Sequence, residues 1–193
     1  MQVKTRLPTL AEYLAAFEEQ PVEIVDGEII PMSPGGREQP NVETNTLILL
    51  QPYVKEHNLG KVFPEASFVL DGNRRKDWVK NARKPDIAFI SKERIEAHNK
   101  KYPARSEPWW LAPDLAVEVI SPTDRFADIN RKVTDYLRYG ARIVWLIDPE
   151  ARTITIYTPD HPLKTLYDDD TLDAEPIIPG WSAPVAALFE EEE

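Results

Sequence analysis

Two carboxylates and one lysine lie in or beside predicted strands in the middle of the chain, and together they suit metal-assisted hydrolysis. Asp86 opens the short apolar run PDIAFI, and Glu118 lies inside a second apolar run, LAVEVISP. Lys132 follows in a segment with helical spacing. An unpaired carboxylate in a buried strand is energetically costly, so Glu118 needs a partner or a bound cation. Metal binding is the chemistry that these residues suggest first.

The two carboxylates converge near strand ends if their strands share one sheet. Two carboxylates held close together repel each other, and one pKa rises unless a cation lies between them. Hard oxygen ligands at an open site favour magnesium or manganese, and such an ion activates water and stabilises charge on a phosphate. Lys132, about two turns into the next helix, could orient the attacking water or stabilise the phosphate.

Each of these residues also has a purely structural interpretation. Glu118 could form an ion pair with Lys132 or Arg131 and have no further role, although such a pair is weak evidence of stability. Its apolar neighbours on both sides favour a functional role. Asp86 alone would be interpreted as an acid that caps a turn after Pro85, and Lys132 as an exposed helix lysine.

A fourth acid and several basic residues could complete the site. Glu65, beside Pro64 in a strand-like run, is a further candidate metal ligand. Glu43, in the preceding helical segment, is its rival and ranks lower, because an acid in a strand is harder to explain as solvated surface. Three basic residues are candidates for phosphate contacts, namely Lys84, Arg125 and Arg131.

The elements that must position these residues form a mixed α/β pattern. Helical spacing predicts helices at 9–19, 40–55, 91–100 and 124–139, with caps at Thr9 and Ser91 and a kink or break at Pro52. Strands are predicted at 61–70, 86–90, 115–120, 143–147 and 153–157, with a hairpin at 22–32 and an edge strand at 172–178. The segment 71–83 is predicted to be a polar loop. We expect one α/β domain over 1–193, with a central mixed sheet flanked by helices, a core at about 20–157 and a solvated acidic tail at 190–193.

The composition excludes several kinds of site. The chain has 193 residues and no cysteine, which excludes disulfides, zinc–thiolate sites and cysteine nucleophiles. The three histidines lie far apart, which argues against a histidine metal cluster or a Ser/His/Asp triad. The formal net charge of −10 argues against nucleic-acid affinity from charge alone, although basic residues concentrate at 74–84 and 125–138. No signal peptide is visible, and no apolar run approaches the roughly 20 residues that span a bilayer, so the cytoplasm is the expected compartment.

The order of these residues resembles that of a known nuclease superfamily. Pro85-Asp86, a glutamate in a strand and then a lysine resemble the PD-(D/E)XK nucleases. That pattern places the lysine two residues after the glutamate, where this chain has Ile120, so Lys132 would be a relocated lysine. A closer resemblance, to the Uma-two family of restriction-endonuclease-like proteins, is carried by VEIVDGEIIPMSP at 22–34, PDIAFI at 85–90 and PDLAVEVISPTDRFADINRKVTDYLRYGARIVWLIDPE at 113–150.

The resemblance implies a restriction-endonuclease-like core with Asp86, Glu118 and Lys132 as the active-site set. The expected function is a Mg²⁺- or Mn²⁺-dependent endonuclease that hydrolyses DNA phosphodiester bonds by metal-activated water. A homodimer would suit the cutting of both strands of a duplex. Two alternatives stay open. One is a binding or assembly module that has lost catalysis, which the missing lysine at 120 and the net negative charge favour. The other is a nuclease that acts only with a partner protein.

Overall fold

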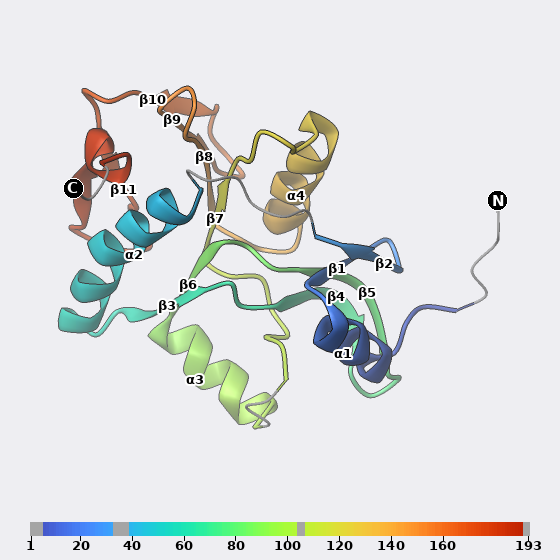
Figure 1. Cartoon of the computed structure of the whole chain (residues 1–193). Coiled ribbons are helices and arrows are strands. Elements are labelled where there is room, and N and C mark those ends of the chain that lie inside the picture. Colours follow the sequence, from blue (N-terminus) through green and yellow to red (C-terminus); the bar gives the residue numbers. More distant parts are fainter. Residues whose placement is uncertain (1–5, 33–38, 104–106, 191–193) are drawn as a thin grey trace.

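The computed structural model describes residues 6–32, 39–103 and 107–190, which form three sheets and four α-helices. The largest sheet has six strands in the order β10-β9-β8-β7-β6-β3 and runs through the middle of the molecule (Figure 1). Its strands are β3 (Gly60–Pro64), β6 (Ile87–Ser91), β7 (Leu115–Val119), β8 (Ile143–Asp148), β9 (Thr153–Tyr157) and β10 (Lys164–Leu166). The helices are α1 (Leu10–Glu19), α2 (Gln39–Glu56), α3 (Lys92–Lys101) and α4 (Phe126–Arg138).

The six-stranded sheet is mixed, as predicted. β7 pairs in parallel with β8, and α4 makes the crossover between them. β6 pairs antiparallel with both β7 and β3, and β9 pairs antiparallel with β8 and β10. The strands predicted at 86–90, 115–120, 143–147 and 153–157 are therefore confirmed, together with the helix between the second and third of them.

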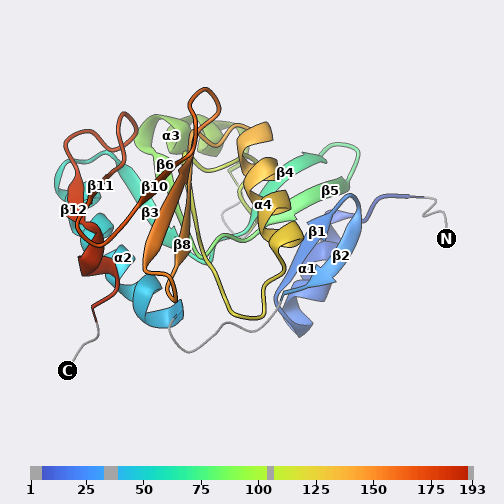
Figure 2. The same cartoon turned by 90° about the horizontal axis from the view of Figure 1, so that it is seen from above.

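Helices α2 and α4 cover opposite faces of this sheet. Val117 and Val119 of β7 belong to the core that includes buried residues of α2. Ala116, which points to the other face, packs with Val133 of α4. Because side chains alternate along a strand, Glu118 shares the face of Ala116 and points toward α4. In Figure 2, α4 lies between the six-stranded sheet and the second sheet.

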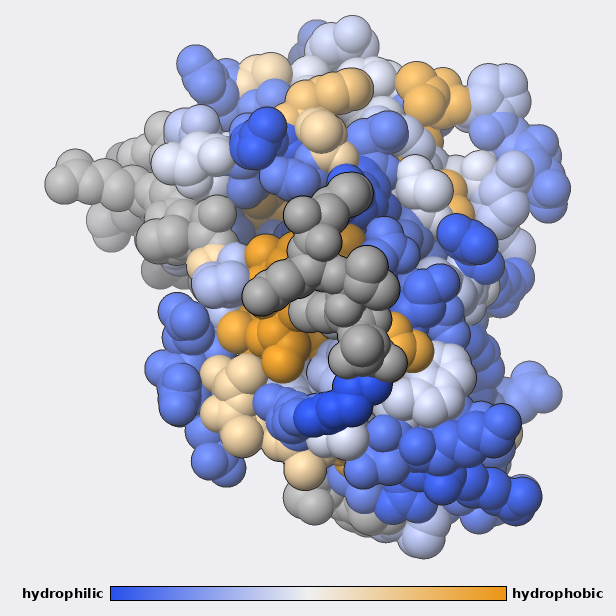
Figure 3. All heavy atoms as spheres, turned by 90° about the vertical axis from the view of Figure 1, so that its right-hand side faces the viewer, coloured by the Kyte–Doolittle hydropathy of each residue, from blue (hydrophilic) through white to orange (hydrophobic). Residues whose placement is uncertain are grey.

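The second sheet has four strands in the order β2-β1-β5-β4. They are β1 (Val22–Val25), β2 (Glu28–Pro31), β4 (Phe68–Asn73) and β5 (Trp78–Arg83). The predicted hairpin is confirmed, with Asp26 and Gly27 both at positive φ in its turn. The predicted Thr9 cap is also confirmed, because α1 begins with a capping box between Thr9 and Glu12. The side of the molecule that carries α1 and the hairpin is mostly hydrophilic, with a hydrophobic area near its centre and smaller ones toward its top (Figure 3).

Two sequence predictions for residues 61–83 are wrong. The run at 61–70 does not form one interrupted strand, because β3 and β4 belong to different sheets. The segment 71–83 is no polar loop, because β5 pairs along β4 and its last three residues are buried. Asn81 and Arg83 are polar, yet both bind partners that are distant in sequence, and this long-range pairing conceals the strand from local patterns.

The C-terminal part also differs from the prediction. Instead of an edge strand at 172–178, β11 (Thr171–Asp173) pairs with β12 (Ser182–Pro184) in a separate two-stranded sheet. A short 3₁₀ helix, η1 (Val185–Leu188), follows and packs on α2. Leu172 and Trp181 extend the main core. Most of the acidic tail predicted at 190–193 lies outside the described residues.

Two predictions about helices need smaller corrections. Helix α2 continues through Pro52 to Glu56, so the predicted break at this residue is absent. Ser91 precedes α3, but its side chain makes no cap hydrogen bond. Among the described ranges, no helix is long and apolar enough to cross a membrane.

Candidate active site

The register of β6 and β7 brings the two predicted acids together. Ile87 pairs with Val117 across this antiparallel ladder, so Asp86 lies opposite Glu118, one position further along. The backbone N–H of Val119 donates to Asp86 Oδ2 at 2.7 Å, which fixes the carboxyl at the end of the strand. Two acids that are widely separated in sequence thus lie side by side on neighbouring interior strands of the sheet.

Glu118 receives two hydrogen bonds from the inner face of α4. The Lys132 ammonium donates to Oε2 at 2.7 Å, and the Tyr136 hydroxyl donates to Oε1 at 2.7 Å. Lys132 and Tyr136 are four residues apart, so one helical face presents both donors to one carboxylate. Both side chains therefore lie on the inner side of the helix, and the predicted ion pair between Glu118 and Lys132 is present.

Both acids of this pair bind protons more tightly than usual. Burial and the neighbouring charge of Glu118 raise the pKa of Asp86 to about 8. Burial likewise raises the pKa of Glu118, although the charge of Lys132 lowers it. Asp86 accepts hydrogen bonds only from uncharged groups among the described residues, the Val119 amide and the Gln39 side chain. An additional positive charge beside Asp86 would therefore be stabilising.

The donors to Glu118 respond to the same buried charges. Burial lowers the pKa of Lys132, but the carboxylates of Glu118 and Glu23 raise it more strongly, so the ammonium keeps its proton. Burial and the charge of Glu118 raise the pKa of Tyr136 well above its usual range. Lys132 is thus a fixed positive charge at neutral pH, and Tyr136 is a fixed hydroxyl donor.

A second buried charge cluster lies beside the first and uses the same helix. Arg83 donates from Nη1 to Glu23 at 2.7 Å and from Nη2 and Nε to Asp135, one position before Tyr136. Glu23 also accepts the backbone N–H of Lys84 at 3.0 Å. This cluster joins β1, β5 and α4, so it ties the four-stranded sheet to the helix that carries Lys132.

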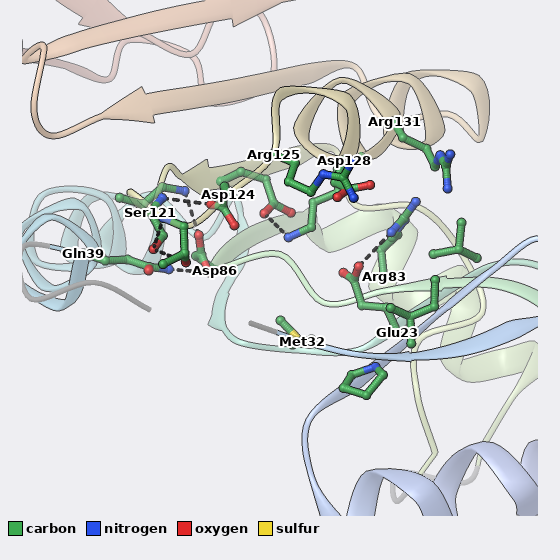
Figure 4. Close-up of a pocket in the computed structure, with 17 residues that line it drawn as sticks. Glu23, Met32, Gln39, Arg83, Asp86, Ser121, Asp124, Arg125, Asp128 and Arg131 are labelled. Carbon is green, nitrogen blue, oxygen red and sulfur yellow. Dashed lines mark hydrogen bonds and ion pairs between the residues drawn. The ribbon is translucent and has the colours of Figure 1, made fainter. Parts of the chain in front are cut away.

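A cavity of about 230 Å³ opens between these clusters. Its wall includes Asp86, Glu118 and Lys132. Arg131 lines it from α4, and Arg125 lines it from the position before the helix (Figure 4). Both arginines are exposed, and neither pairs with a carboxylate in the part of the chain that the structure describes. Two of the three predicted phosphate contacts therefore border the predicted catalytic residues.

The other predicted site residues lie elsewhere. Glu65 is largely exposed, adopts a positive φ of 47° and pairs with Lys84, so neither side chain borders the cavity. Its backbone N–H nevertheless donates to the Asp86 carbonyl at 2.9 Å. The rival acid, Glu43, resembles Asp86 and Glu118 in that burial raises its pKa. The charges of Glu65 and Glu118 add to this effect.

The residues present fit a divalent cation in chemistry. Asp86 and Glu118 provide hard oxygen donors, and burial raises the pKa of both, so a cation that offsets their charge would be favourable. Four carboxyl groups share this region with two cationic side chains, namely Glu23, Asp86, Glu118 and Asp135 with Arg83 and Lys132. Within the described residues, however, no group of three or more acids and histidines is already arranged to hold a metal ion.

Sequence reasoning did not single out Glu23, Arg83 or the hydroxyl of Tyr136. Glu23 lies between apolar residues in the run VEIV, so the criterion that selected Glu118 also identifies Glu23. Arg83 carries no such signal, because the composition of 71–83 predicts a polar loop. Tyr136 has the spacing of an apolar residue on the inner face of the helix, and only the structure shows that its hydroxyl donates to Glu118.

The chain is an α/β protein whose central mixed sheet carries two adjacent acids, with a lysine from the following helix beside them. The chain belongs to the Uma2 family: the family model, described as "Putative restriction endonuclease", matches residues 10–186. A crystal structure from Anabaena variabilis ATCC 29413, described as "a putative nuclease belonging to DUF820", is similar to this chain with a TM-score of 0.74 and 19% sequence identity, over 94% of this chain and 97% of that chain. No protein among the curated ones matches. The predicted family and the predicted fold class are thus confirmed.

Proposed function

We propose that the protein is a divalent-cation-dependent endonuclease that hydrolyses phosphodiester bonds of DNA. The observation that carries this proposal is the adjacency of Asp86 and Glu118, two acids with raised pKa values, beside a lysine and a cavity. Membership of the family supports a nuclease in general. The requirement for a divalent cation and the choice of DNA as substrate are what we propose beyond family membership.

Asp86 and Glu118 would hold the cation, with Mg²⁺ and Mn²⁺ as the fitting ions. When bound, the ion would supply Lewis-acid activation of water and would stabilise charge on the phosphate. Tyr136 holds Glu118 in place through its hydroxyl and limits the rotation of that carboxylate. Asp86 is held in the same way by the Val119 amide.

The cationic side chains would act on the substrate. Lys132 is 25% exposed, so its ammonium can reach the cavity while it stays bound to Glu118, and it can stabilise charge that develops on a phosphate oxygen. Arg125 and Arg131 line the same cavity and would bind neighbouring phosphates of the backbone, which would fix the position of the strand without reading its sequence.

The test is a calorimetric titration of Mn²⁺ into the wild type and Glu118→Ala, followed by plasmid cleavage with the same samples. We expect binding and nicking by the wild type and loss of both in the variant. Glu96→Ala, which removes an exposed acid of α3, is the matched control and should retain both. A well-folded wild type that binds no Mn²⁺ would contradict the proposal.

One observation favours a second candidate, a binding module that keeps the fold without catalysis. The oxygens of Glu118 are already bonded to Lys132 and Tyr136, so the cluster is stable without a ligand. Position 120, where the superfamily pattern has its lysine, is an isoleucine. This candidate predicts DNA binding that is the same in the wild type and in Asp86→Ala, with no cleavage by either.

A further inference from the structure

The cavity of the candidate site has two walls of different chemistry. From α4 and the position before it, Arg131 and Arg125 present guanidinium groups. From the β1–β2 hairpin and the residue that follows it, Val25, Ile30 and Met32 present apolar side chains. Figure 4 shows Met32 on the opposite side of the cavity from the two arginines. A ligand that fills this space therefore contacts charged groups on one side and carbon atoms on the other.

The register of the hairpin directs Ile30 toward the cavity. Ile30 pairs with Glu23 across the antiparallel ladder, and residues paired in this way share one face of a sheet. Glu23 bonds to Arg83, which also bonds to Asp135 of α4, so this face of the hairpin is the one turned to α4. Ile30 is nevertheless 38% exposed. A ligand that covers its side chain would be stabilised by the apolar surface removed from water.

The charges around the cavity give a polyanion little net attraction. Acidic side chains outnumber basic ones among the described residues that line it, with Glu23, Asp86, Glu118, Asp124 and Asp128 against Arg83, Arg125, Arg131 and Lys132. Arg83 and Lys132 are already bonded to carboxylates. Because basic residues supply most of the affinity for a phosphate backbone, the apolar wall must contribute to the binding of a nucleic acid here.

The size of the cavity and its apolar wall favour an unpaired nucleotide. Small-molecule sites measure about 300–1,000 Å³, so a cavity of about 230 Å³ holds no more than one nucleotide. In a duplex, neighbouring base pairs cover both faces of each base, and these faces cannot pack on Ile30 or Val25. The bases of a single strand can unstack, and apolar side chains then contact their faces.

We propose that the site acts on single-stranded DNA, with an unpaired base against Val25, Ile30 and Met32 and its phosphates on Arg125 and Arg131. This inference rests on the proposed function and specifies the form of its substrate. Ile30 would contact the base and not the reacting phosphate, so its loss should raise KM more than it lowers kcat. Supercoiled plasmid DNA opens locally, so nicking of a plasmid is compatible with this preference.

The test uses the full chain and one DNA sequence in two forms, a fluorescein-labelled single strand and the same strand annealed to its complement. Cleavage in Mn²⁺ gives kcat/KM for each form, and fluorescence anisotropy in EDTA gives the affinity without cleavage. We expect the wild type to bind the single strand about tenfold or more tightly than the duplex, and to cut it faster by a similar factor.

Three variants test the role of the apolar wall. Ile30→Ser removes most of the apolar side chain and should weaken binding of the single strand about tenfold, with the affinity for Mn²⁺ retained. Ile30→Val keeps most of that surface and should stay within about twofold of the wild type. Ile48→Ser makes the same change at an exposed isoleucine of α2 that does not line the cavity, so it is the matched control and should match the wild type.

The outcomes separate this inference from the function on which it rests. If the wild type cuts the duplex as fast as the single strand, or if Ile30→Ser matches Ile48→Ser, the inference is overturned and the nuclease function stands. If the folded wild type cuts neither form in Mn²⁺, the proposed function is overturned and this inference with it. Thermal unfolding of each variant confirms that it has folded.

Discussion

Two buried charge clusters lie side by side on α4, and they differ in how their carboxylates are paired. In the cluster of Glu23, Arg83 and Asp135, both acids bond to one guanidinium that is only 4% exposed. In the cluster of Glu118, Lys132 and Tyr136, the neighbouring Asp86 has no cationic partner bonded to it among the described residues.

The difference separates a structural role from a functional one. Arginine keeps its charge under all ordinary conditions, so the first cluster has one stable protonation state and joins two sheets to a helix. The second cluster keeps an acid with a raised pKa at the wall of a cavity, where solutes can reach it. Perturbed acids in such positions are typical of functional sites.

The largest loss of stability is expected when the structural cluster is broken. Arg83→Met would leave Glu23 and Asp135 buried without their cation and should lower the free energy of unfolding by about 3–5 kcal/mol. Lys132→Met is the comparison, and we expect a smaller loss of about 1–3 kcal/mol, because Lys132 is 25% exposed and Glu118 can take up a proton. Urea unfolding at pH 7 measures both, and equal losses would remove the distinction between the clusters.

Asp86→Asn should stabilise the metal-free protein, with a dependence on pH. The pKa of Asp86 in the folded protein, about 8, lies above its unfolded value of about 3.9. Between these values the folded state keeps a proton that the unfolded state has lost, so the stability of the wild type falls as the pH rises through this window. Because asparagine does not titrate, Asp86→Asn removes this pH-dependent loss of stability.

The advantage of Asp86→Asn should be near zero at pH 4 and should grow by about 1.4 kcal/mol per pH unit between pH 4 and pH 8, to a plateau of several kcal/mol. Thermal and urea unfolding in EDTA, from pH 4 to pH 9, measure this difference. A variant that is equally or less stable than the wild type at pH 9 would show that Asp86 carries no unrelieved charge.

A smaller effect is expected for the hydroxyl that orients Glu118. Tyr136→Phe leaves a buried carboxylate oxygen without its donor and should cost about 1–2 kcal/mol in urea unfolding. Tyr53→Phe, which removes an exposed hydroxyl bonded to the Pro179 carbonyl, is the matched control and should cost less. If both variants lose the same free energy of unfolding, the hydrogen bond to Glu118 contributes no more than one at the surface.

The main elements could be predicted because their patterns are local. The apolar runs at 87–91, 115–119 and 143–148 form strands, and the acid inside the second run is the one that contacts Lys132. Strand β5 could not be predicted in this way, because the partners of Asn81 and Arg83 lie more than 50 residues away in sequence. Local composition gives no information about such pairs.

The direction of individual side chains was the least predictable feature. Glu65 and Glu43 both precede Asp86 in sequence, and no pattern tells which of them turns toward it. The structure turns Glu65 outward at a positive φ, whereas α2 brings Glu43 and Gln39 to the side of Asp86. That outcome depends on how a helix docks on a sheet, which is a property of packing across the whole chain.

The most direct test of the central claim, that Asp86 and Glu118 form a cation site, is the number of protons released when Mn²⁺ binds. Calorimetry at pH 7 in two buffers with different ionisation enthalpies gives this number. Because the pKa of Asp86 is about 8, a bound cation should displace about one proton, and Asp86→Asn should abolish this release. Binding without proton release, or binding that Asp86→Asn leaves unchanged, would contradict the claim.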